Sequence, residues 1–286
     1  MKIKKITVYS PYVPEVVRNI SPPPKNLYIK GAALDELLKY PFVTVVGTRK
    51  VSAYGKEVTT KLVREFAQAG VGVVSGLAIG VDGLAHRAAL EAGAPTIAVL
   101  PCGLDRIYPS SHRALAQQIL QQGGALVSEY PEGAVVYKGN FVARNRLAAG
   151  LGNALLITEA TEKSGTMHTA RFALEQGKEV LAVPGNITSP GSAGTNNLIK
   201  SGATPVTSAS DVLHVLGVTP HTAKTAPKSH DPGEQAILDL LAAGTSDGAE
   251  LLSASELEVR AFNQALTMLE IRGYIRSLGN NHWALL

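Results

Sequence analysis

The fold of this chain is decided by Val43-Thr44-Val45-Val46-Gly47-Thr48-Arg49-Lys50-Val51-Ser52-Ala53-Tyr54-Gly55. The stretch begins as an apolar, β-branched run, which predicts a buried parallel strand. The run ends at Gly47, where the backbone can turn tightly, and Gly55 opens a helix-like segment. A strand, a glycine turn and a helix N-terminus together form an anion site from backbone N–H groups and the helix dipole. Arg49 and Lys50 lie in that turn, so it predicts a phosphate or nucleic-acid site; the alternative is an ordinary βα turn with two solvated bases.

Strand-like and helix-like segments alternate from Tyr40 to Gly217. The strand-like runs are Val43–Val46, Val71–Ser75, Thr96–Leu100, Ala125–Ser128, Ala154–Thr158 and Val180–Val183. The helix-like segments are Lys56–Ala69, Asp82–Ala92, Ser110–Gln121, Asn140–Leu151 and Gly165–Gln176. This alternation predicts an α/β fold with a doubly wound, mostly parallel sheet and helices on both faces. Ligands of such sheets bind beyond the carboxyl ends of the strands, where this chain carries its distinctive loops.

The composition fits a protein with a substantial core and no membrane helix. The chain has 286 residues, of which 45% are hydrophobic, and its longest apolar runs have the length of strands. No apolar segment follows the basic N-terminus, so no secretory signal is expected. The single cysteine, Cys102, excludes an intramolecular disulfide and a cysteine metal cluster, and it is typical of a reducing cytoplasm. We therefore expect a cytoplasmic protein without a cofactor or metal.

The charge is distributed unevenly along the chain. Residues 1–229 hold 24 Lys and Arg against 15 Asp and Glu, a net charge of +9. Residues 230–286 hold 3 against 8, a net charge of −5. This asymmetry indicates a body that meets an anion and a tail that does not.

Punctuation by proline and glycine predicts four segments. Residues 1–40 form a basic N-terminal extension whose cluster Pro22-Pro23-Pro24 indicates an extended strap. Residues 41–217 form the α/β domain, and 218–233, rich in Thr, Pro, Lys and His, form a linker. Residues 234–286 form a small C-terminal domain.

The C-terminal pattern is typical of a winged helix. Helical segments at 235–243, 249–256 and 258–272 precede a hairpin signal at Gly279-Asn280-Asn281. The candidate recognition helix sets Glu258 and Glu270 against Arg260 and Arg272. A partner-binding or regulatory role is therefore favoured over DNA contact for this domain.

Catalytic signatures are missing from the sequence. There is no Gly-x-Gly-x-x-Gly after the first strand, no P-loop and no Gly-x-Ser-x-Gly. Asp82 and His86 stand one helical turn apart, and a helix cap plus a surface histidine is favoured over a metal pair. Cys102 is expected to pack as a small apolar residue. Glu159 and Glu162 are candidates for acid and base, with a solvated loop as the equal alternative.

Basic residues and one aromatic residue do gather at the predicted strand ends. They are Arg49, Lys50, Lys138, Phe141, Arg144, Arg146 and Lys163. Basic side chains contact the phosphate backbone, and Phe141 offers a face on which an unpaired nucleobase can stack. This combination suits single-stranded nucleic acid. Core packing is the alternative for Phe141.

Taken together, these loops resemble the DNA-processing protein A (DprA/Smf) family over residues 22–218. The motifs that carry the resemblance are Val45-Val46-Gly47-Thr48-Arg49 with Ser52 and Tyr54-Gly55, Ser75-Gly76-Leu77-Ala78-Ile79-Gly80-Val81-Asp82, Gly103-Leu104-Asp105 with Tyr108-Pro109, Phe141 with Arg144-Asn145-Arg146, Ser164-Gly165-Thr166, Val183-Pro184-Gly185, and Gly194-Thr195-Asn196 with Leu198-Ile199. In this order and spacing they are highly specific. The C-terminal unit resembles the family's winged-helix domain through weaker motifs.

The resemblance implies an extended Rossmann-like domain that binds single-stranded DNA in a basic pocket and forms a homodimer. It further implies a non-enzymatic protein that protects incoming DNA and loads the RecA recombinase during natural transformation and recombination. The family's DNA-contacting positions map onto Arg49, Lys138 and Phe141, with Lys163 a softer transfer. The full expected nucleic-acid site is Gly47, Thr48, Arg49, Lys50, Lys138, Phe141, Arg144, Arg146, Lys163, Ser164, Gly165 and Thr166.

The chain also departs from the family, and other functions remain open. Residues 1–40 are too short for the N-terminal helical domain of many members, and Gly-Thr-Arg replaces the commoner Gly-Ser-Arg. The sheet is similar to that of nucleoside-monophosphate phosphoribohydrolases, which implies an enzyme or a nucleotide sensor as alternatives. Those enzymes show Pro-Gly-Gly-x-Gly-Thr, whereas this chain has a single glycine, Gly165, in Glu159–Thr166.

Overall fold

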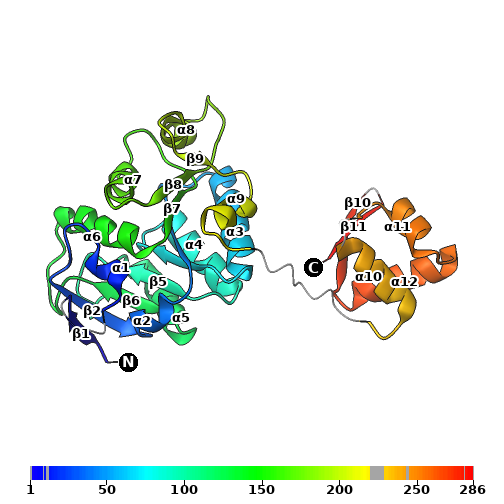
Figure 1. The fold of residues 1–286 in the computed structure, drawn as a ribbon, viewed down its shortest axis with the longest axis horizontal. Helices are drawn as coiled ribbons and strands as arrows, with labels where there is room; N and C mark the ends of the chain where they lie inside the picture. Colours follow the sequence, from blue (N-terminus) through cyan, green and yellow to red (C-terminus); the bar gives the residue numbers. More distant parts are fainter. Residues whose placement is uncertain are drawn as a thin grey trace. The chain divides into compact units, whose positions relative to one another are not determined.

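The computed structural model describes residues 2–8, 10, 13–219, 229–242, 245–279 and 281–285. The chain divides into two compact units, Met1–Pro220 and His221–Leu286 (Figure 1), which are described separately. The predicted linker 218–233 lies largely outside the described residues, so its limits stay a prediction.

The first unit is built on one nine-stranded sheet in the order β1-β2-β6-β5-β4-β3-β7-β8-β9. The strands are β1 (Lys4–Thr7), β2 (Asn26–Gly31), β3 (Phe42–Val46), β4 (Gly72–Ser75), β5 (Thr96–Val99), β6 (Ala125–Ser128), β7 (Ala154–Ile157), β8 (Glu179–Ala182) and β9 (Thr204–Pro205). The seven neighbouring strands β6, β5, β4, β3, β7, β8 and β9 run parallel. Strand β2 pairs antiparallel with β6, and β1 pairs antiparallel with β2. The predicted doubly wound, mostly parallel sheet is confirmed.

Helices cover both faces of the sheet (Figure 1). One face carries α3 (Ala53–Gln68), α4 (Val81–Glu91), α5 (Arg113–Gln121) and α9 (Ala209–Val215). The other carries α1 (Glu15–Arg18), α2 (Leu34–Leu37), α6 (Lys138–Leu151), α7 (Thr166–Glu175) and α8 (Ala193–Lys200). Short 3₁₀ turns, η1 (Ser110–His112) and η2 (Pro190–Ser192), precede α5 and α8.

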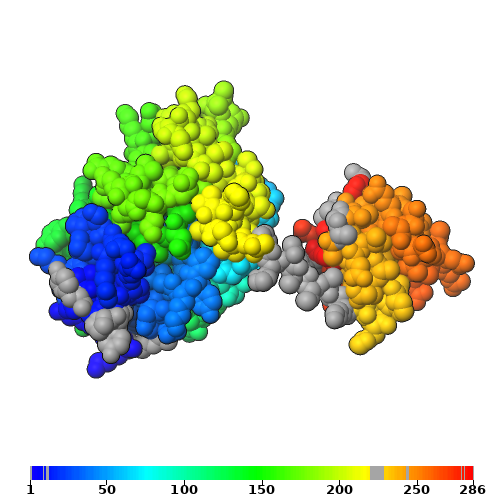
Figure 2. Space-filling view, in the orientation of Figure 1, coloured from blue at the N-terminus to red at the C-terminus, as the bar shows by residue number. Residues whose placement is uncertain are grey.

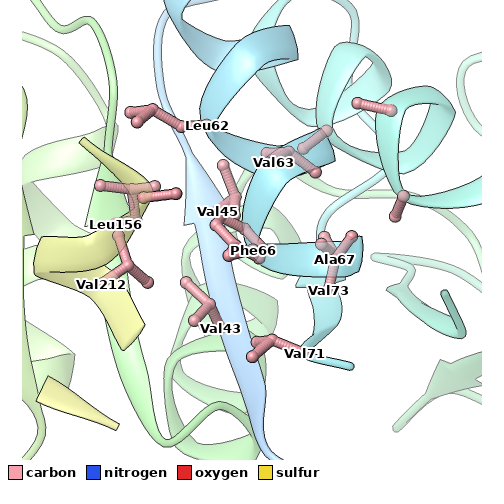
Figure 3. Packing of buried hydrophobic residues seen from close by; sticks show 14 of the residues in the cluster. Val43, Val45, Leu62, Val63, Phe66, Ala67, Val71, Val73, Leu156 and Val212 are labelled. Atoms are coloured by element: carbon pink, nitrogen blue, oxygen red, sulfur yellow. The ribbon is translucent and has the colours of Figure 1, made fainter. Parts of the chain in front are cut away.

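Successive residues of β3 pack on opposite faces, as the strand periodicity requires. Val43 and Val45 meet Phe66 of α3 in one core (Figure 3), whereas Phe42 and Val46 face the other layer. All five residues of β3 are buried. A continuous apolar run in the centre of a parallel sheet is therefore explained by burial on both faces.

The first forty residues are not the extended strap that the prolines indicated. Strands β1 and β2 join the sheet edge, and β2 pairs with β6. Leu27 and Ile29 alternate with more exposed neighbours in β2 and are buried at 2% and 6% exposure. In the space-filling view the N-terminal residues, in blue, form part of the surface of the first unit (Figure 2). The strap interpretation overlooked this alternation, which buries one side of an edge strand.

The second unit has the elements expected of a winged helix. Three helices, α10 (Pro232–Ala242), α11 (Gly248–Ser255) and α12 (Val259–Ile271), precede a hairpin of β10 (Ile275–Gly279) and β11 (His282–Leu285). Asn280 of the predicted turn lies outside the described residues. Glu234 is buried and forms a 2.6 Å ion pair with Arg272. One of the two bases that the sequence placed on the candidate recognition helix is therefore used inside the unit.

His86 of α4 is fully buried, which corrects the expected surface histidine. Its Nδ1 lies 2.7 Å from Thr96 Oγ1 at the start of β5, and its Nε2 has no partner among the described residues. Burial and the neighbouring His112 lower the pKa of His86 from its usual 6.5 to about 3. The imidazole is consequently neutral in the folded protein across the physiological range.

This burial predicts acid lability. Below pH 6.5 the unfolded chain binds a proton on His86 and the folded chain does not. The contribution of neutral His86 to the free energy of unfolding is therefore fully present above about pH 6.5 and declines between pH 6.5 and about 3. We expect the His86 contribution to decline by about 1.4 kcal/mol per pH unit in that window. Urea unfolding of wild type and His86→Gln across pH 4–7 measures it. An equally steep decline in both proteins would contradict the prediction.

Candidate nucleic-acid interface

A cavity lies where the strand order reverses. The chain runs outward from β3 through β4 and β5 to β6, then returns through α6 to β7 on the other side of β3. Loops that follow β3 and β7 therefore diverge, and ligands of open α/β sheets bind at such points. A cavity of about 440 Å³ is found there. It is lined by Val46, Gly47, Arg49, Ala78, Asp82, Phe141, Val142, Arg144, Asn145, Ser164, Gly165, Thr166 and Thr169.

The structure brings together seven of the twelve residues expected in the site. Those that line the cavity are Gly47, Arg49, Phe141, Arg144, Ser164, Gly165 and Thr166. Those that do not line it are Thr48, Lys50, Lys138, Arg146 and Lys163. Lys50, Lys138 and Lys163 are exposed. Ala78 in the loop after β4 and Asp82 in α4 also line the cavity, although neither belongs to the site expected from the sequence, which was built on basic residues.

The N-terminus of α3 is not the anion site that the sequence indicated. Glu159, at the end of β7 and only 5% exposed, accepts a hydrogen bond from Ser52 N at 2.9 Å. Ser52 in turn caps the helix by accepting from Gly55 N at 3.0 Å. The protein's own carboxylate thus occupies this positive helix end. Glu159 is neither a solvated loop residue nor a lining residue of the cavity.

Two opposite charges lie at the cavity. Asp82 is 7% and Arg144 5% exposed. Asp82 Oδ2 accepts from Gly76 N at 3.1 Å and from Ala78 N at 3.3 Å, so its carboxylate orders the loop before α4 and does not cap that helix. Burial raises the pKa of Asp82, although the nearby Arg144 opposes the shift.

Arg144 of α6 holds the ends of two strands together. Its Nη1 donates to the carbonyls of Gly76 and Val99, which lie at the ends of β4 and β5. The guanidinium fills the space beside Gly76, where a Cβ atom would collide with it. Burial lowers the pKa of Arg144, and Asp82 opposes that shift. Arg144 is therefore a structural cation that also borders the cavity.

Phe141 lies between a cation and a second aromatic ring. The Arg49 guanidinium carbon is 5.5 Å from the centre of the Phe141 ring, a cation–π arrangement. Tyr108 meets the same ring edge-on, with centroids 5.3 Å apart and planes at 70°. A second cavity of about 80 Å³ shares Arg49, Ala78, Phe141 and Arg144 with the first. Phe141 is half-buried, so it borders both cavities without being part of a closed core.

Small polar residues complete the cavity at the start of α7. Ser164 Oγ accepts from Thr166 N at 3.2 Å and donates to Thr166 Oγ1 at 2.9 Å. The N-cap of α7 is Gly165, without a side-chain cap bond, so neither hydroxyl caps the helix. The turn instead places two hydroxyl groups at the cavity wall.

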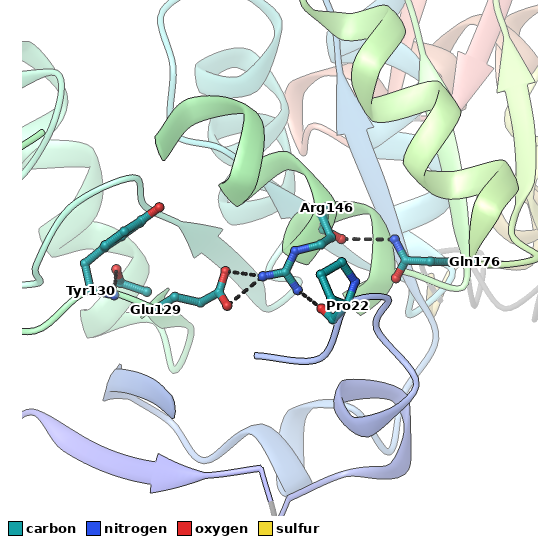
Figure 4. Close-up of polar contacts among 6 residues, drawn as sticks. Pro22, Glu129, Tyr130, Arg146 and Gln176 are labelled. Carbon is teal, nitrogen blue, oxygen red and sulfur yellow. Dashed lines mark hydrogen bonds and ion pairs between the residues drawn. The ribbon is translucent and has the colours of Figure 1, made fainter. Parts of the chain in front are cut away.

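Arg146 is turned away from this site. Its Nη2 contacts both carboxylate oxygens of Glu129 at 2.6 Å, and Nη1 donates to the carbonyl of Pro22 (Figure 4). Its backbone carbonyl accepts from Gln176 Nε2 at 3.2 Å. The guanidinium is consumed by these contacts, which join the N-terminal segment, the end of β6 and α6. The structure places Arg146 in a buried clasp and not at the interface, contrary to the sequence expectation.

The described residues contain no group of three or more His, Cys, Asp and Glu side chains arranged to hold a metal ion. They also contain no helix that is both long and apolar enough to cross a membrane.

Comparisons with known proteins agree with this architecture. Residues 4–217 match the family model of DNA recombination-mediator protein A, and residues 221–281 match that of the DprA winged helix domain. Protein Smf of Escherichia coli is 43% identical over 216 residues, which cover 75% of this chain and 57% of that protein. DNA processing protein DprA of Bacillus subtilis is 38% identical over 214 residues, covering 75% and 71%. The chain spans little more than half the length of the first of these relatives.

Solved structures give the same result. DNA processing protein A from Streptococcus pneumoniae superposes with a TM-score of 0.70 at 38% identity, covering 74% of each chain. The protein of the same name from Helicobacter pylori superposes with a TM-score of 0.67 at 35% identity, covering 75% of this chain and 95% of that one. The latter structure was described for its single-stranded DNA binding mode.

Proposed function

This chain belongs to the DNA recombination-mediator protein A (DprA/Smf) family, and we propose that it binds single-stranded DNA at the cavity beyond β3 and β7. The observation that carries the proposal is the arrangement of Arg49 against the face of Phe141 at the rim of a 440 Å³ cavity. A cation supplies contact with phosphate, and an aromatic face supplies stacking that any unpaired base accepts. The single-strand binding described for the Helicobacter pylori relative supports the same assignment.

The exposed lysines extend the proposed path of the strand. Lys138 begins α6 three residues before Phe141, and Lys50 directly follows Arg49. Lys163 precedes the hydroxyl turn at the cavity wall. Long, exposed lysine side chains of this kind can contact phosphates without being part of a cavity. We assign the backbone of the strand to these lysines and one unpaired nucleotide to the cavity.

Further parts of the proposal rest on family membership. We propose that the protein is a non-enzymatic homodimer that acts in DNA processing during transformation and loads RecA onto the bound strand. Light scattering of the full chain measures the oligomeric state. RecA filament assembly on single-stranded DNA already coated with a single-strand-binding protein, with and without this chain, measures loading.

The primary test is fluorescence anisotropy with single- and double-stranded oligonucleotides of equal length at two salt concentrations. We expect a strong preference for the single strand, with log affinity falling linearly with log salt by about 0.7 per phosphate neutralised. Equal, weak binding to both forms would reduce the basic surface to a nonspecific patch and refute the proposal.

A nucleotide sensor or phosphoribohydrolase-like enzyme is the competing function. Calorimetric titration with nucleoside monophosphates against a long oligo(dT) separates the two. Tight mononucleotide binding without a preference for the polymer would favour the sensor, and release of free base would favour the enzyme. We expect neither, because the buried carboxylate of Asp82 lines the cavity together with Arg144 and would repel a compact phosphate beside that cation.

A further inference from the structure

Asp82 has an unused hydrogen-bond acceptor at the cavity. Both backbone N–H groups that bind its carboxylate, those of Gly76 and Ala78, use Oδ2. In the described part of the chain, Oδ1 makes no hydrogen bond. It is also not one of the buried polar atoms that lack a partner, so this oxygen is accessible. No ion pair within 4 Å engages Asp82 among those residues. A carboxylate oxygen with spare acceptor capacity is therefore open to the cavity that Asp82 lines.

The charges at the cavity select a neutral ligand group there. Asp82 and Arg144 are both buried and of opposite sign, so a phosphate beside Arg144 would also meet the carboxylate. An edge that carries both a donor and an acceptor is matched to this pair. The Watson–Crick edge of a nucleobase has that character: thymine offers N3–H, guanine N1–H, and adenine and cytosine an exocyclic amine beside a ring nitrogen.

We propose that Asp82 determines recognition of the bound nucleotide by accepting a hydrogen bond from an N–H donor on the Watson–Crick edge of an unpaired base. The proposal rests on the function proposed above and extends it to one atom. All four bases carry such a donor, so the contact tolerates any sequence. In a duplex the donor is already used by the opposite base, so the contact excludes paired bases.

The conservative variant Asp82→Asn has a defined geometry. The oxygen of the amide is held at the Oδ2 position, because Gly76 N and Ala78 N both donate there. The NH₂ group then replaces the open acceptor, so the variant presents a donor of nearly the same size. It retains the loop hydrogen bonds and reverses the polarity of one cavity atom.

The test uses the full chain and three oligonucleotides of one length, built from thymidine, 2′-deoxyuridine or N3-methylthymidine. N3-methylation removes the donor and retains the aromatic face, and deoxyuridine controls for a change that leaves N3–H intact. For the wild type we expect equal binding of the first two and at least ~10-fold weaker binding of the third, the effect of one hydrogen bond to a charged group. For Asp82→Asn we expect discrimination to fall below ~2-fold. The added methyl group has the same bulk in both experiments.

The possible outcomes distinguish the role of Asp82 from single-strand binding itself. Tight wild-type binding of oligo(dT) without discrimination against N3-methylthymidine would overturn the role of Asp82 and leave single-strand binding intact. Equal discrimination by wild type and Asp82→Asn would assign the reading to another group. Failure of the wild type to prefer single-stranded over double-stranded DNA would refute both proposals. The wild-type comparison needs no variant, so it stands even if Asp82→Asn unfolds because Arg144 loses its counter-charge.

Discussion

Replacing Arg49 by glutamate is expected to weaken single-strand binding at least ~100-fold, with little change in stability. The substitution removes a cation that lines both cavities and puts a carboxylate in its place. A lost hydrogen bond between charged groups accounts for ~1.5–3 kcal/mol, and repulsion of the phosphate adds a similar amount. Because Arg49 is exposed and its contact with Phe141 contributes only ~0.5–1 kcal/mol, the fold should tolerate the change.

Two matched variants show whether position or overall charge causes the loss. Lys61→Glu makes the same change of charge at an exposed position in the middle of α3 and should cost less than ~3-fold at 0.15 M salt. Lys138 lies at the exposed start of α6 and does not line the cavity. The loss of affinity in Lys138→Glu should therefore be smaller than in Arg49→Glu and larger than in Lys61→Glu. Anisotropy titrations, with thermal melts to compare stability, measure all three. Equal losses for Arg49→Glu and Lys61→Glu would contradict a specific site.

The order of elements was predictable because each depends on local pattern. Strand β6 has the predicted bounds, 125–128, and the predicted helix at 82–92 is α4 at 81–91. Apolar runs of strand length and helical periodicity are visible within a dozen residues. The pairing of β2 with β6 was not predicted, since it joins segments about one hundred residues apart. An edge strand near prolines resembles an irregular segment until its partner is known.

The candidate site was predictable in its positions but not in the state of its charges. A sequence shows that Glu159, Asp82 and Arg144 follow strands or begin helices, yet it does not show which carboxylates are buried. Glu159 is bound by Ser52 N, 107 residues away, and Arg144 by carbonyls 45 and 68 residues away. The local sequence thus indicated a vacant anion site at the N-terminus of α3, although the carboxylate of the distant Glu159 is bound there.

The role of Arg146 was also not predictable from its local sequence, and its replacement is expected to reduce stability strongly. Arg144-Asn145-Arg146 reads as two cations of one interface, but only Arg144 reaches the cavity. Arg146 and Glu129 side chains are 10% and 18% exposed, and their 2.6 Å contact is supported by the Pro22 carbonyl. Removal of one member leaves the other charge poorly solvated and uncompensated. We therefore expect Arg146→Met to destabilise the first unit by ~3–5 kcal/mol.

Urea unfolding of Arg146→Met, beside Arg171→Met as a control, measures this loss. Arg171 also pairs with a glutamate at 2.7 Å, but the side chains are 74% and 47% exposed, so its removal should cost less than ~0.5 kcal/mol. At a temperature where Arg146→Met remains folded, its affinity for single-stranded DNA should stay within ~2-fold of wild type, because the guanidinium faces Glu129 and Pro22 and not the cavity. A large loss of affinity without a loss of stability would return Arg146 to the interface. A large loss of stability with affinity retained would assign it to the clasp, and would explain why two arginines two residues apart have different functions.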